Sequence, residues 1–240
     1  MTSLDIKTIK NLSSEARFCI LACAFTASWG MMQLFVVKQV PMDLTLIGLG
    51  VTSFVLSEFL FAITFPITDV VTEVWGAKRA RAIVYGGALV NLLVMIFLSI
   101  AVMLPAPEYW QAQNSAYNLL YEAAPRIWVA SISAVVVSQL LDIYVFKLIR
   151  GVTGDRLLWL RNNGSTLVSQ AVDTVIFYMI AFYGLVSNEA LISLLIGNYL
   201  LKIVLATADT PVVYLLVRWA RGPDEAPATQ ASNQAHPDVA

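Results

Sequence analysis

Seven ionisable side chains of this 240-residue chain lie within or next to long apolar stretches: Glu58, Asp69, Glu73, Asp142, Asp173, Lys202 and Asp209. An ionisable group inside a bilayer costs about 2.5–3.5 kcal/mol on insertion scales, so each one needs a binding, ion-moving or pairing role. Four neutral amides accompany them: Asn91, Gln139, Gln170 and Asn198. Carboxylates accept hydrogen bonds and amides both donate and accept them. This combination indicates a polar site surrounded by apolar helices.

The most informative pattern is Ser-Gln-x-x-Asp, which occurs twice with an offset of 31 residues. Residues three apart share one helix face, so the Gln and Asp of each copy point the same way. The chain reverses between the copies, and a hairpin folded near residue 156 places Gln139 level with Asp173. The same hairpin places Asp142 level with Gln170. Two carboxylates and two amides are therefore expected to converge in one layer, on the cytoplasmic side of the membrane midplane.

This polar layer matches a neutral planar ligand whose edge carries adjacent N–H donors, such as N1–H and the 2-amino group of a guanine-like base. The same side chains could instead hold two helices together. Matched aspartates favour a ligand or ion site over helix association alone. Phe146 and Phe177 each follow an aspartate by four residues. Their rings could stack on a base or pack between helices.

The remaining carboxylates are expected along the same path. Glu58 falls about 14 residues into an apolar stretch and is predicted to be a further ligand or a proton carrier. Asp69 and Glu73 follow Pro66 and are predicted to form the inner part of the path. Helix capping is the alternative for Asp69. For Glu73 the alternative is a surface ion pair with the basic residues Lys78, Arg79 and Arg81.

A cation also lies deep in an apolar stretch. Lys202 is expected to neutralise one of these carboxylates, because pairing would keep both groups charged. Asp209 follows two helical turns later on the same face. The two residues are predicted to form a charge pair or part of a coupling cycle.

Composition excludes several classes of protein. With 58% hydrophobic residues, 13% charged residues and a mean hydropathy of +0.72, the chain is not a soluble domain. The net charge of −1 argues against a nucleic-acid partner. The one histidine, His236, lies in a polar tail, which argues against histidine-based catalysis and haem or zinc sites. Cys19 and Cys23 are expected to be buried apolar residues. The sequence contains no Walker glycine loop, which argues against ATP hydrolysis by this chain. No enzymatic activity, metal or cofactor is therefore expected.

The elements that must position these residues are membrane-spanning helices. A hydrocarbon core of about 30 Å needs about 20 apolar residues. That rule predicts an all-α bundle of six spans, at 17–37, 44–66, 81–104, 127–147, 165–186 and 190–217. Twelve lysines and arginines flank one side of these spans and two, Lys38 and Arg126, flank the other. The positive-inside rule then places both termini in the cytoplasm.

Three segments are expected beyond the plain spans. Pro66 should break the second span, so that 67–75 bends away as a short helix. Such broken helices line cavities in transporters, and a structural kink is the alternative. Residues 1–16 form a cytoplasmic segment, 17–221 the transmembrane domain, and 222–240 a disordered cytoplasmic tail.

Several longer motifs carry a family resemblance. They are Phe-Pro-Ile-Thr-Asp-Val-Val-Thr-Glu-Val-Trp-Gly at 65–76 with Lys78 and Arg79 behind it, Pro-Arg-Ile at 125–127, Ala-Ser at 130–131, Trp-Leu-Arg-Asn-Asn at 159–163, and the two Ser-Gln-x-x-Asp copies. In this order they resemble the queuosine precursor transporter family, formerly grouped as vitamin-uptake-like transporters.

That resemblance implies a six-helix carrier in the bacterial inner membrane that works as a homodimer. It implies uptake of 7-cyano- or 7-aminomethyl-7-deazaguanine, precursors of the modified tRNA base queuosine, by alternating access. Two other classes remain open. One is a substrate-binding membrane subunit of an energy-coupling uptake complex for a vitamin-like molecule. The other is an intramembrane enzyme that uses aspartates or a serine-lysine pair.

Overall fold

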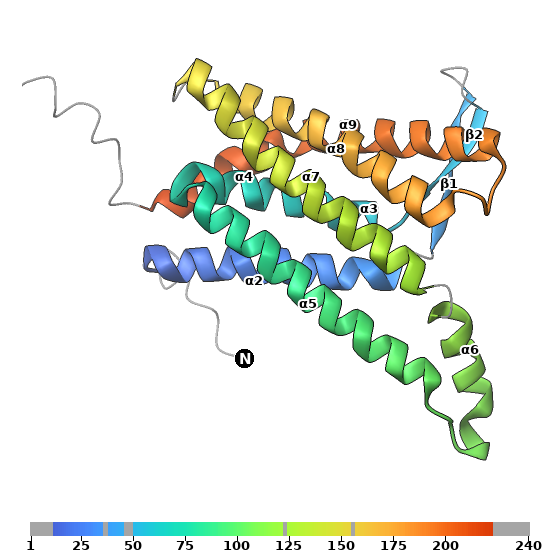
Figure 1. Cartoon of the computed structure of the whole chain (residues 1–240). Helices are drawn as coiled ribbons and strands as arrows, with labels where there is room; N and C mark the ends of the chain where they lie inside the picture. The colour runs from blue at the N-terminus through green and yellow to red at the C-terminus, as the bar shows by residue number, and fades with distance from the viewer. Residues whose placement is uncertain (1–11, 36–37, 46–49, 122–123, 155–156, 223–240) are drawn as a thin grey trace, which may run out of the picture.

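The computed structural model describes residues 12–35, 38–45, 50–121, 124–154 and 157–222. Helices form most of this structure, and one short hairpin interrupts them (Figure 1). In chain order the elements are α2 (Ser14–Phe35), β1 (Gln39–Leu44), β2 (Gly50–Val55), α3 (Glu58–Phe61), α4 (Thr64–Trp75), α5 (Ala77–Met103), η2 (Glu108–Trp110), α6 (Gln111–Tyr121), α7 (Ala124–Thr153), α8 (Leu158–Phe182) and α9 (Asn188–Arg221).

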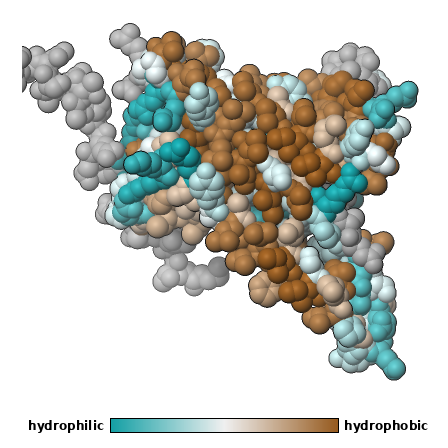
Figure 2. All heavy atoms as spheres, viewed as in Figure 1, coloured by the Kyte–Doolittle hydropathy of each residue, from teal (hydrophilic) through white to brown (hydrophobic). Residues whose placement is uncertain are grey.

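Within the described residues, five helices are long and apolar enough to cross a membrane: α2, α5, α7, α8 and α9. They correspond to five of the predicted spans and confirm a helical membrane bundle. Their outward faces form a broad apolar surface, which Figure 2 shows in brown. Cys19 and Cys23 belong to the exposed surface of α2, so the expectation that they are buried is wrong.

The predicted helical span at 44–66 is also wrong. Its first part lies in an antiparallel hairpin, in which Gln39 pairs with Val55 and Leu44 pairs with Gly50. Its second part contains α3 and, after a turn at 62–63, the start of α4. A short apolar run suits a strand as well as a helix, and the run at 51–55 contains β-branched and aromatic residues that favour a strand.

The break in this region comes before Pro66 and not at it. Pro66 is the third residue of α4, within the first helical turn. Backbone N–H groups of a first turn have no partner inside the helix, so a proline costs little there. The short helix expected at 67–75 is therefore present, but it begins at Thr64.

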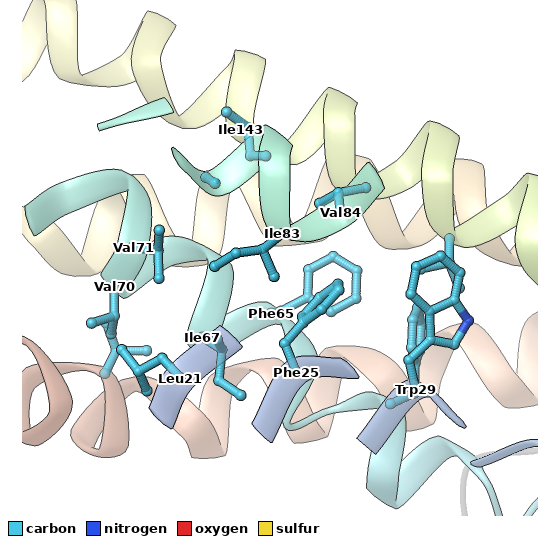
Figure 3. Close-up of a cluster of buried hydrophobic side chains, with 14 of the residues drawn as sticks. Leu21, Phe25, Trp29, Phe65, Ile67, Val70, Val71, Ile83, Val84 and Ile143 are labelled. Atoms are coloured by element: carbon cyan, nitrogen blue, oxygen red, sulfur yellow. The ribbon is translucent and has the colours of Figure 1, made fainter. Parts of the chain in front are cut away.

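Helix α4 lies at the centre of the bundle. Its residues 64–73 are all buried, and it contacts α2, α5, α7, α8 and α9. Figure 3 shows the apolar cluster around it, where Phe65 lies near Phe25 and Trp29 of α2 and Val84 of α5. Gly87 allows α5 to approach α2 closely, because a Cβ at this position would lie 2.8 Å from the Trp29 ring.

The bundle has two distinct ends (Figure 1). The start of α2, the α4–α5 junction, the α7–α8 turn and the end of α9 lie at one, which we call the terminal end. The β1–β2 hairpin, α6 and the α8–α9 connection lie at the other, the hairpin end. At the hairpin end Arg126 of α7 donates hydrogen bonds to the carbonyls of Ile180 and Tyr183, both at 2.6 Å. These bonds satisfy carbonyl groups at the end of α8.

Candidate functional site

A buried lysine joins two carboxylates near the middle of the bundle. The Nζ atom of Lys202 on α9 lies 2.6 Å from Oδ2 of Asp173 on α8 and 3.4 Å from Oε2 of Glu58 on α3. It also lies 4.6 Å from the centre of the Phe61 ring. All three charged residues are buried. One ammonium facing two ionised carboxylates leaves one negative charge uncompensated, which is costly in an apolar interior.

Two cavities meet at this charged group. The hairpin-side cavity has a volume of about 360 Å³, and the terminus-side cavity about 240 Å³. Glu58, Phe61 and Lys202 line both cavities. The hairpin-side cavity is also lined by Met32, Gln33, Ser57, Ser131, Ala134, Val135, Asp173 and Phe177. The terminus-side cavity is also lined by Ala62, Phe65, Thr166, Gln170, Leu205, Ala206 and Asp209.

The walls of these cavities contain buried acceptors that have no hydrogen-bond partner. They are Oε1 of Gln33 and Oε1 of Gln170, and beside them Oε2 of Glu58 has only its 3.4 Å ion pair with Lys202. Buried polar atoms are normally satisfied, so unsatisfied ones indicate a ligand or water. Because all three atoms are acceptors, a molecule with several N–H donors would complement them.

The two Ser-Gln-x-x-Asp copies form reciprocal contacts between α7 and α8. Ser138 donates a hydrogen bond of 3.0 Å to Asp173, and Ser169 donates one of 2.9 Å to Asp142. Each serine therefore binds the aspartate of the other copy. The two copies therefore face each other across antiparallel helices, as predicted, with a register that differs by one residue from the predicted level of Gln139 with Asp173.

The two glutamines of this layer have different surroundings. Gln139 donates from Nε2 to Thr64 at 3.1 Å and accepts from Thr68 at 2.8 Å, so it ties α7 to α4. Gln170 lines the terminus-side cavity. The two aspartates divide in the same way, since Asp173 lines the hairpin-side cavity and Asp142 is absent from the described lining residues of both cavities.

Asp142 faces a second carboxyl group. Asp69 on α4 lies within side-chain hydrogen-bonding range of it. Asp69 and Asp142 are 1% and 0% exposed.

Asp209 accepts a hydrogen bond of 3.3 Å from Asn162 and makes no ion pair with Lys202 among the described residues. No group of three His, Cys, Asp or Glu side chains in the described part of the chain could hold a metal ion.

Glu73 connects three helices at the terminal end. Its carboxylate lies 2.9 Å from Arg161 of α8, 3.0 Å from Arg221 of α9 and 3.5 Å from Arg150 of α7. The Glu73 side chain is only 2% exposed. The alternative surface pair with Lys78, Arg79 and Arg81 is therefore wrong; Arg79 pairs with Glu15 instead, at 2.8 Å.

The two phenylalanines that follow the repeats, Phe146 and Phe177, have different surroundings. Phe177 lines the hairpin-side cavity, where its ring is available to a ligand. Phe146 is fully buried and lies beneath the Arg161 guanidinium, 5.6 Å from ring centre to Cζ. Phe146 therefore supports the arginine that binds Glu73.

Sequence reasoning missed Gln33 and Ser131. Gln33 on α2 donates a hydrogen bond of 2.8 Å to Ser131 on α7, and both line the hairpin-side cavity. Gln33 is the one amide within the predicted first span, which is the signal that could have identified it.

Comparisons with known proteins identify related transporters. The family model described as "Putative vitamin uptake transporter" matches residues 55–216. A "Probable queuosine precursor transporter" of Bacillus subtilis is 34% identical over 205 residues, which cover 81% of this chain and 88% of that protein. The "Queuosine precursor transporter" of Escherichia coli is 32% identical over 126 residues, covering 52% of this chain and 53% of that protein. A relative from Haemophilus influenzae with the same name as the Bacillus protein is 30% identical over 156 residues, covering 60% and 62%.

No solved structure matches this chain significantly. The family match covers α3 to α8 and most of α9, and it includes most of the residues that line both cavities. On these grounds the chain belongs to the vitamin-uptake-like family of queuosine precursor transporters.

Proposed function

We propose that this chain imports a 7-deazaguanine precursor of queuosine, either the 7-cyano or the 7-aminomethyl compound, across the bacterial inner membrane by alternating access. The observation that carries the proposal is the pair of unsatisfied amide oxygens of Gln33 and Gln170, together with the loosely paired carboxylate of Glu58, around two cavities that share part of their lining. A deazaguanine offers N1–H, a 2-amino group and a ring N–H, which are donors of the required kind. The names of the relatives support the same substrate class.

Glu58 is the proposed anchor of the base edge. Its carboxylate lines both cavities and is held less closely by Lys202 than Asp173 is, at 3.4 Å against 2.6 Å. Two adjacent N–H donors can bind one carboxylate side by side. Lys202 then keeps Asp173 as its partner and offers remaining N–H donors to acceptor atoms of the base. Phe177 supplies an aromatic face in the larger cavity.

Asp142 and Gln139 have a different proposed role. Their hydrogen bonds to Ser169, Thr64 and Thr68 join α7 to α8 and α4. We infer that they set the positions of the helices around the substrate and do not bind the base directly. Asp173 and Gln170 are the members of the predicted layer that line the cavities.

The Glu73 cluster is the proposed inner gate. It joins α4, α7, α8 and α9 at the terminal end, which the positive-inside rule assigns to the cytoplasm. Substrate that reaches the terminus-side cavity would leave only when these ion pairs separate. This arrangement fits a state in which the inner end is closed.

The proposed membrane topology has six crossings. Helices α3 and α4, with the turn at 62–63 between them, run from Glu58 to Trp75, a stretch that reaches about 27 Å at 1.5 Å per residue if nearly collinear. With the five long helices they bring both ends of the described chain to the same side of the membrane. The chain is further proposed to form a homodimer.

Uptake of labelled base tests the proposal. Cells that lack their own precursor transporter should accumulate labelled 7-cyano- or 7-aminomethyl-7-deazaguanine when this chain alone is expressed. Unlabelled precursor should compete, and adenine should not, because its edge has a different donor pattern. If a correctly inserted chain gives no uptake of either compound, the proposed function is wrong.

A further inference from the structure

Two facing carboxyl groups lie deep in the bundle, outside the described lining of either cavity. They belong to Asp69 on α4 and Asp142 on α7, and each side chain is at most 1% exposed. One helical turn away, Gln139 donates a hydrogen bond to Thr64 and accepts one from Thr68, and these two bonds fix α4 against α7. This register brings the two aspartates within hydrogen-bonding range of each other.

The contact requires a proton. Ionised carboxylates contain only acceptors, so two of them can share a hydrogen bond only if one is protonated. Two ionised carboxylates at this distance in an apolar interior would also repel each other strongly. No ion pair to either group is present among the described residues.

The surrounding donors indicate which aspartate holds the proton. Asp142 accepts a hydrogen bond of 2.9 Å from Ser169, which stabilises its ionised form. Both oxygens of Asp69 lack any donor in the described structure. Asp69 is therefore the donor of the pair, and its buried carboxyl group, otherwise without a partner, is the proton-binding group.

Most other charged groups that face α4 have a partner of opposite charge or a hydrogen-bond donor. Lys202 pairs with both Glu58 and Asp173, three arginines surround Glu73, and Asn162 donates a hydrogen bond to Asp209. On α2 and α5, Glu15 pairs with Arg79 at the surface. The elements packed against α4 carry these charged groups: Glu58 on α3; Arg126, Asp142, Lys147 and Arg150 on α7; Arg161 and Asp173 on α8; Glu189, Lys202, Asp209, Arg218 and Arg221 on α9; Glu15 and Arg17 on α2; and Lys78, Arg79 and Arg81 on α5. Their other titratable groups are Cys19 and Cys23 on α2, Tyr85 on α5, Tyr144 on α7, Tyr178 on α8, and Tyr199 and Tyr214 on α9.

We propose that Asp69, paired with Asp142, is the proton-binding site that couples inward movement of the base to inward movement of one proton. This inference rests on the proposed transport function. A proton that binds Asp69 from the outer side permits contact between α4 and α7. Its release to the cytoplasm leaves two facing carboxylates and forces the helices apart. Because α4 also carries Glu73 of the inner gate, four residues further on, proton release and opening of that gate share one moving helix.

Substrate and proton sites are also linked through α7 and α8. Asp142 is held by Ser169, and Asp173 at the cavity is held by Ser138 of the same helix pair. A change in the position of α7 against α8 therefore alters both aspartates. This connection supplies the physical coupling that a symporter needs.

The test uses the full chain purified in liposomes without sodium, with labelled 7-cyano-7-deazaguanine as the probe. When the exterior is more acidic than the interior, the base should accumulate inside to about ten times its external concentration for each unit of pH difference. This ratio is the limit for transport of one proton with each neutral substrate molecule. A sodium gradient at equal pH should drive none. Asp69→Asn should retain exchange of labelled for unlabelled base and lose gradient-driven accumulation. Asp142→Asn is the second variant, in case the first does not fold.

Asp43→Asn is the matched control. Asp43 is an exposed carboxylate in β1 and accepts a hydrogen bond from the Thr45 backbone at 2.9 Å. Hydrogen bonding by Thr45 also lowers the pKa of this carboxyl group. Because it lies far from the Asp69–Asp142 pair along the fold, this variant should accumulate base as the wild type does.

The outcomes separate the two proposals. Absence of base exchange by the wild type contradicts the transport function itself. Exchange without a response to the pH gradient, or full accumulation by folded Asp69→Asn, contradicts proton coupling alone. Infrared spectroscopy adds a readout that needs no substrate. The carbonyl stretch of a buried protonated carboxyl group should be present at neutral pH in the wild type and absent from Asp69→Asn.

Discussion

Ser138 on α7 donates a hydrogen bond of 3.0 Å to Asp173 on α8, and Asp173 uses its other oxygen to bind Lys202 on α9. One aspartate therefore joins three membrane helices at the wall of the hairpin-side cavity. The corresponding contact runs from Ser169 on α8 to Asp142 on α7, and no lysine pairs with Asp142 among the described residues. The aspartate of the second copy, Asp173, is thus paired with Lys202 and lies at the cavity. The aspartate of the first copy, Asp142, faces Asp69 instead.

Replacing the lysine should destabilise the protein strongly. Lys202→Met leaves Glu58 and Asp173 buried without a cation, and loss of one partner from a buried pair costs about 3–5 kcal/mol. The double variant Lys202→Met/Asp173→Asn should recover part of this loss, because it removes one stranded charge. Thermal unfolding of the purified protein in detergent measures both effects.

The control for this prediction is a surface pair. Arg79 and Glu15 form an ion pair with side chains 41% and 67% exposed. Arg79→Met should cost at most about 1 kcal/mol. Equal destabilisation by the two single variants would show that Lys202 does not compensate buried carboxylates.

Neutralising Glu73 should open the terminal end of the bundle. In Glu73→Gln the three arginines lose their shared anion, so the helices that carry them separate more easily. With Cys19 and Cys23 replaced by alanine, Thr166→Cys in the terminus-side cavity reports access. A membrane-impermeant thiol reagent applied from the cytoplasm should label this cysteine severalfold faster when Glu73→Gln is present. Unchanged labelling would contradict the inner gate.

Two adjacent glycines of α5 should respond oppositely to alanine. A Cβ at Gly87 would lie 2.8 Å from the Trp29 ring and 2.9 Å from the Phe25 ring, whereas one at Gly86 meets no atom within 4 Å. Gly87→Ala should destabilise the protein by about 1–3 kcal/mol through overpacking. Gly86→Ala should stabilise it by up to about 1 kcal/mol through helix propensity. Melting temperatures that move in the same direction would contradict the close contact of α5 with α2.

Replacing Ser138 and replacing Ser169 should affect different properties of uptake. Ser138→Ala withdraws a donor from Asp173 at the cavity, and a hydrogen bond to a charged group contributes about 1.5–3 kcal/mol. Its apparent KM for uptake should therefore rise. Ser169→Ala withdraws the donor from Asp142 and should shift the pH profile of uptake with a smaller effect on KM. Identical effects in kinetic assays of the two variants would contradict the division of roles.

The contact between the two Ser-Gln-x-x-Asp copies could be predicted from sequence, because antiparallel neighbouring helices have a simple register. Ser138 meets Asp173 within one residue of the predicted level. Five long spans could be predicted for a related reason, since length and hydropathy identify a membrane helix directly. The roles of these residues in substrate binding remain predictions.

Other features depend on tertiary packing that no local pattern encodes. The basic residues nearest Glu73 in sequence lie at the start of α5, which turns away after Gly76, so its partners come from three distant helices. The hairpin at 39–55 was missed because short apolar runs do not distinguish strand from helix. The contact of Gln33 with Ser131 could not be predicted, because the two residues lie 98 positions apart in the sequence.

Binding of base to Glu58→Gln is the most direct test of the central claim that substrate occupies the junction of the two cavities. This substitution removes the proposed anchor and leaves Lys202 with its closer partner Asp173, so the fold should survive. Equilibrium binding of labelled 7-cyano-7-deazaguanine to purified protein should weaken about 10- to 100-fold, which corresponds to loss of a charged hydrogen bond. Glu15→Gln, at the exposed surface, should bind as the wild type does. Unchanged affinity in folded Glu58→Gln would contradict the account.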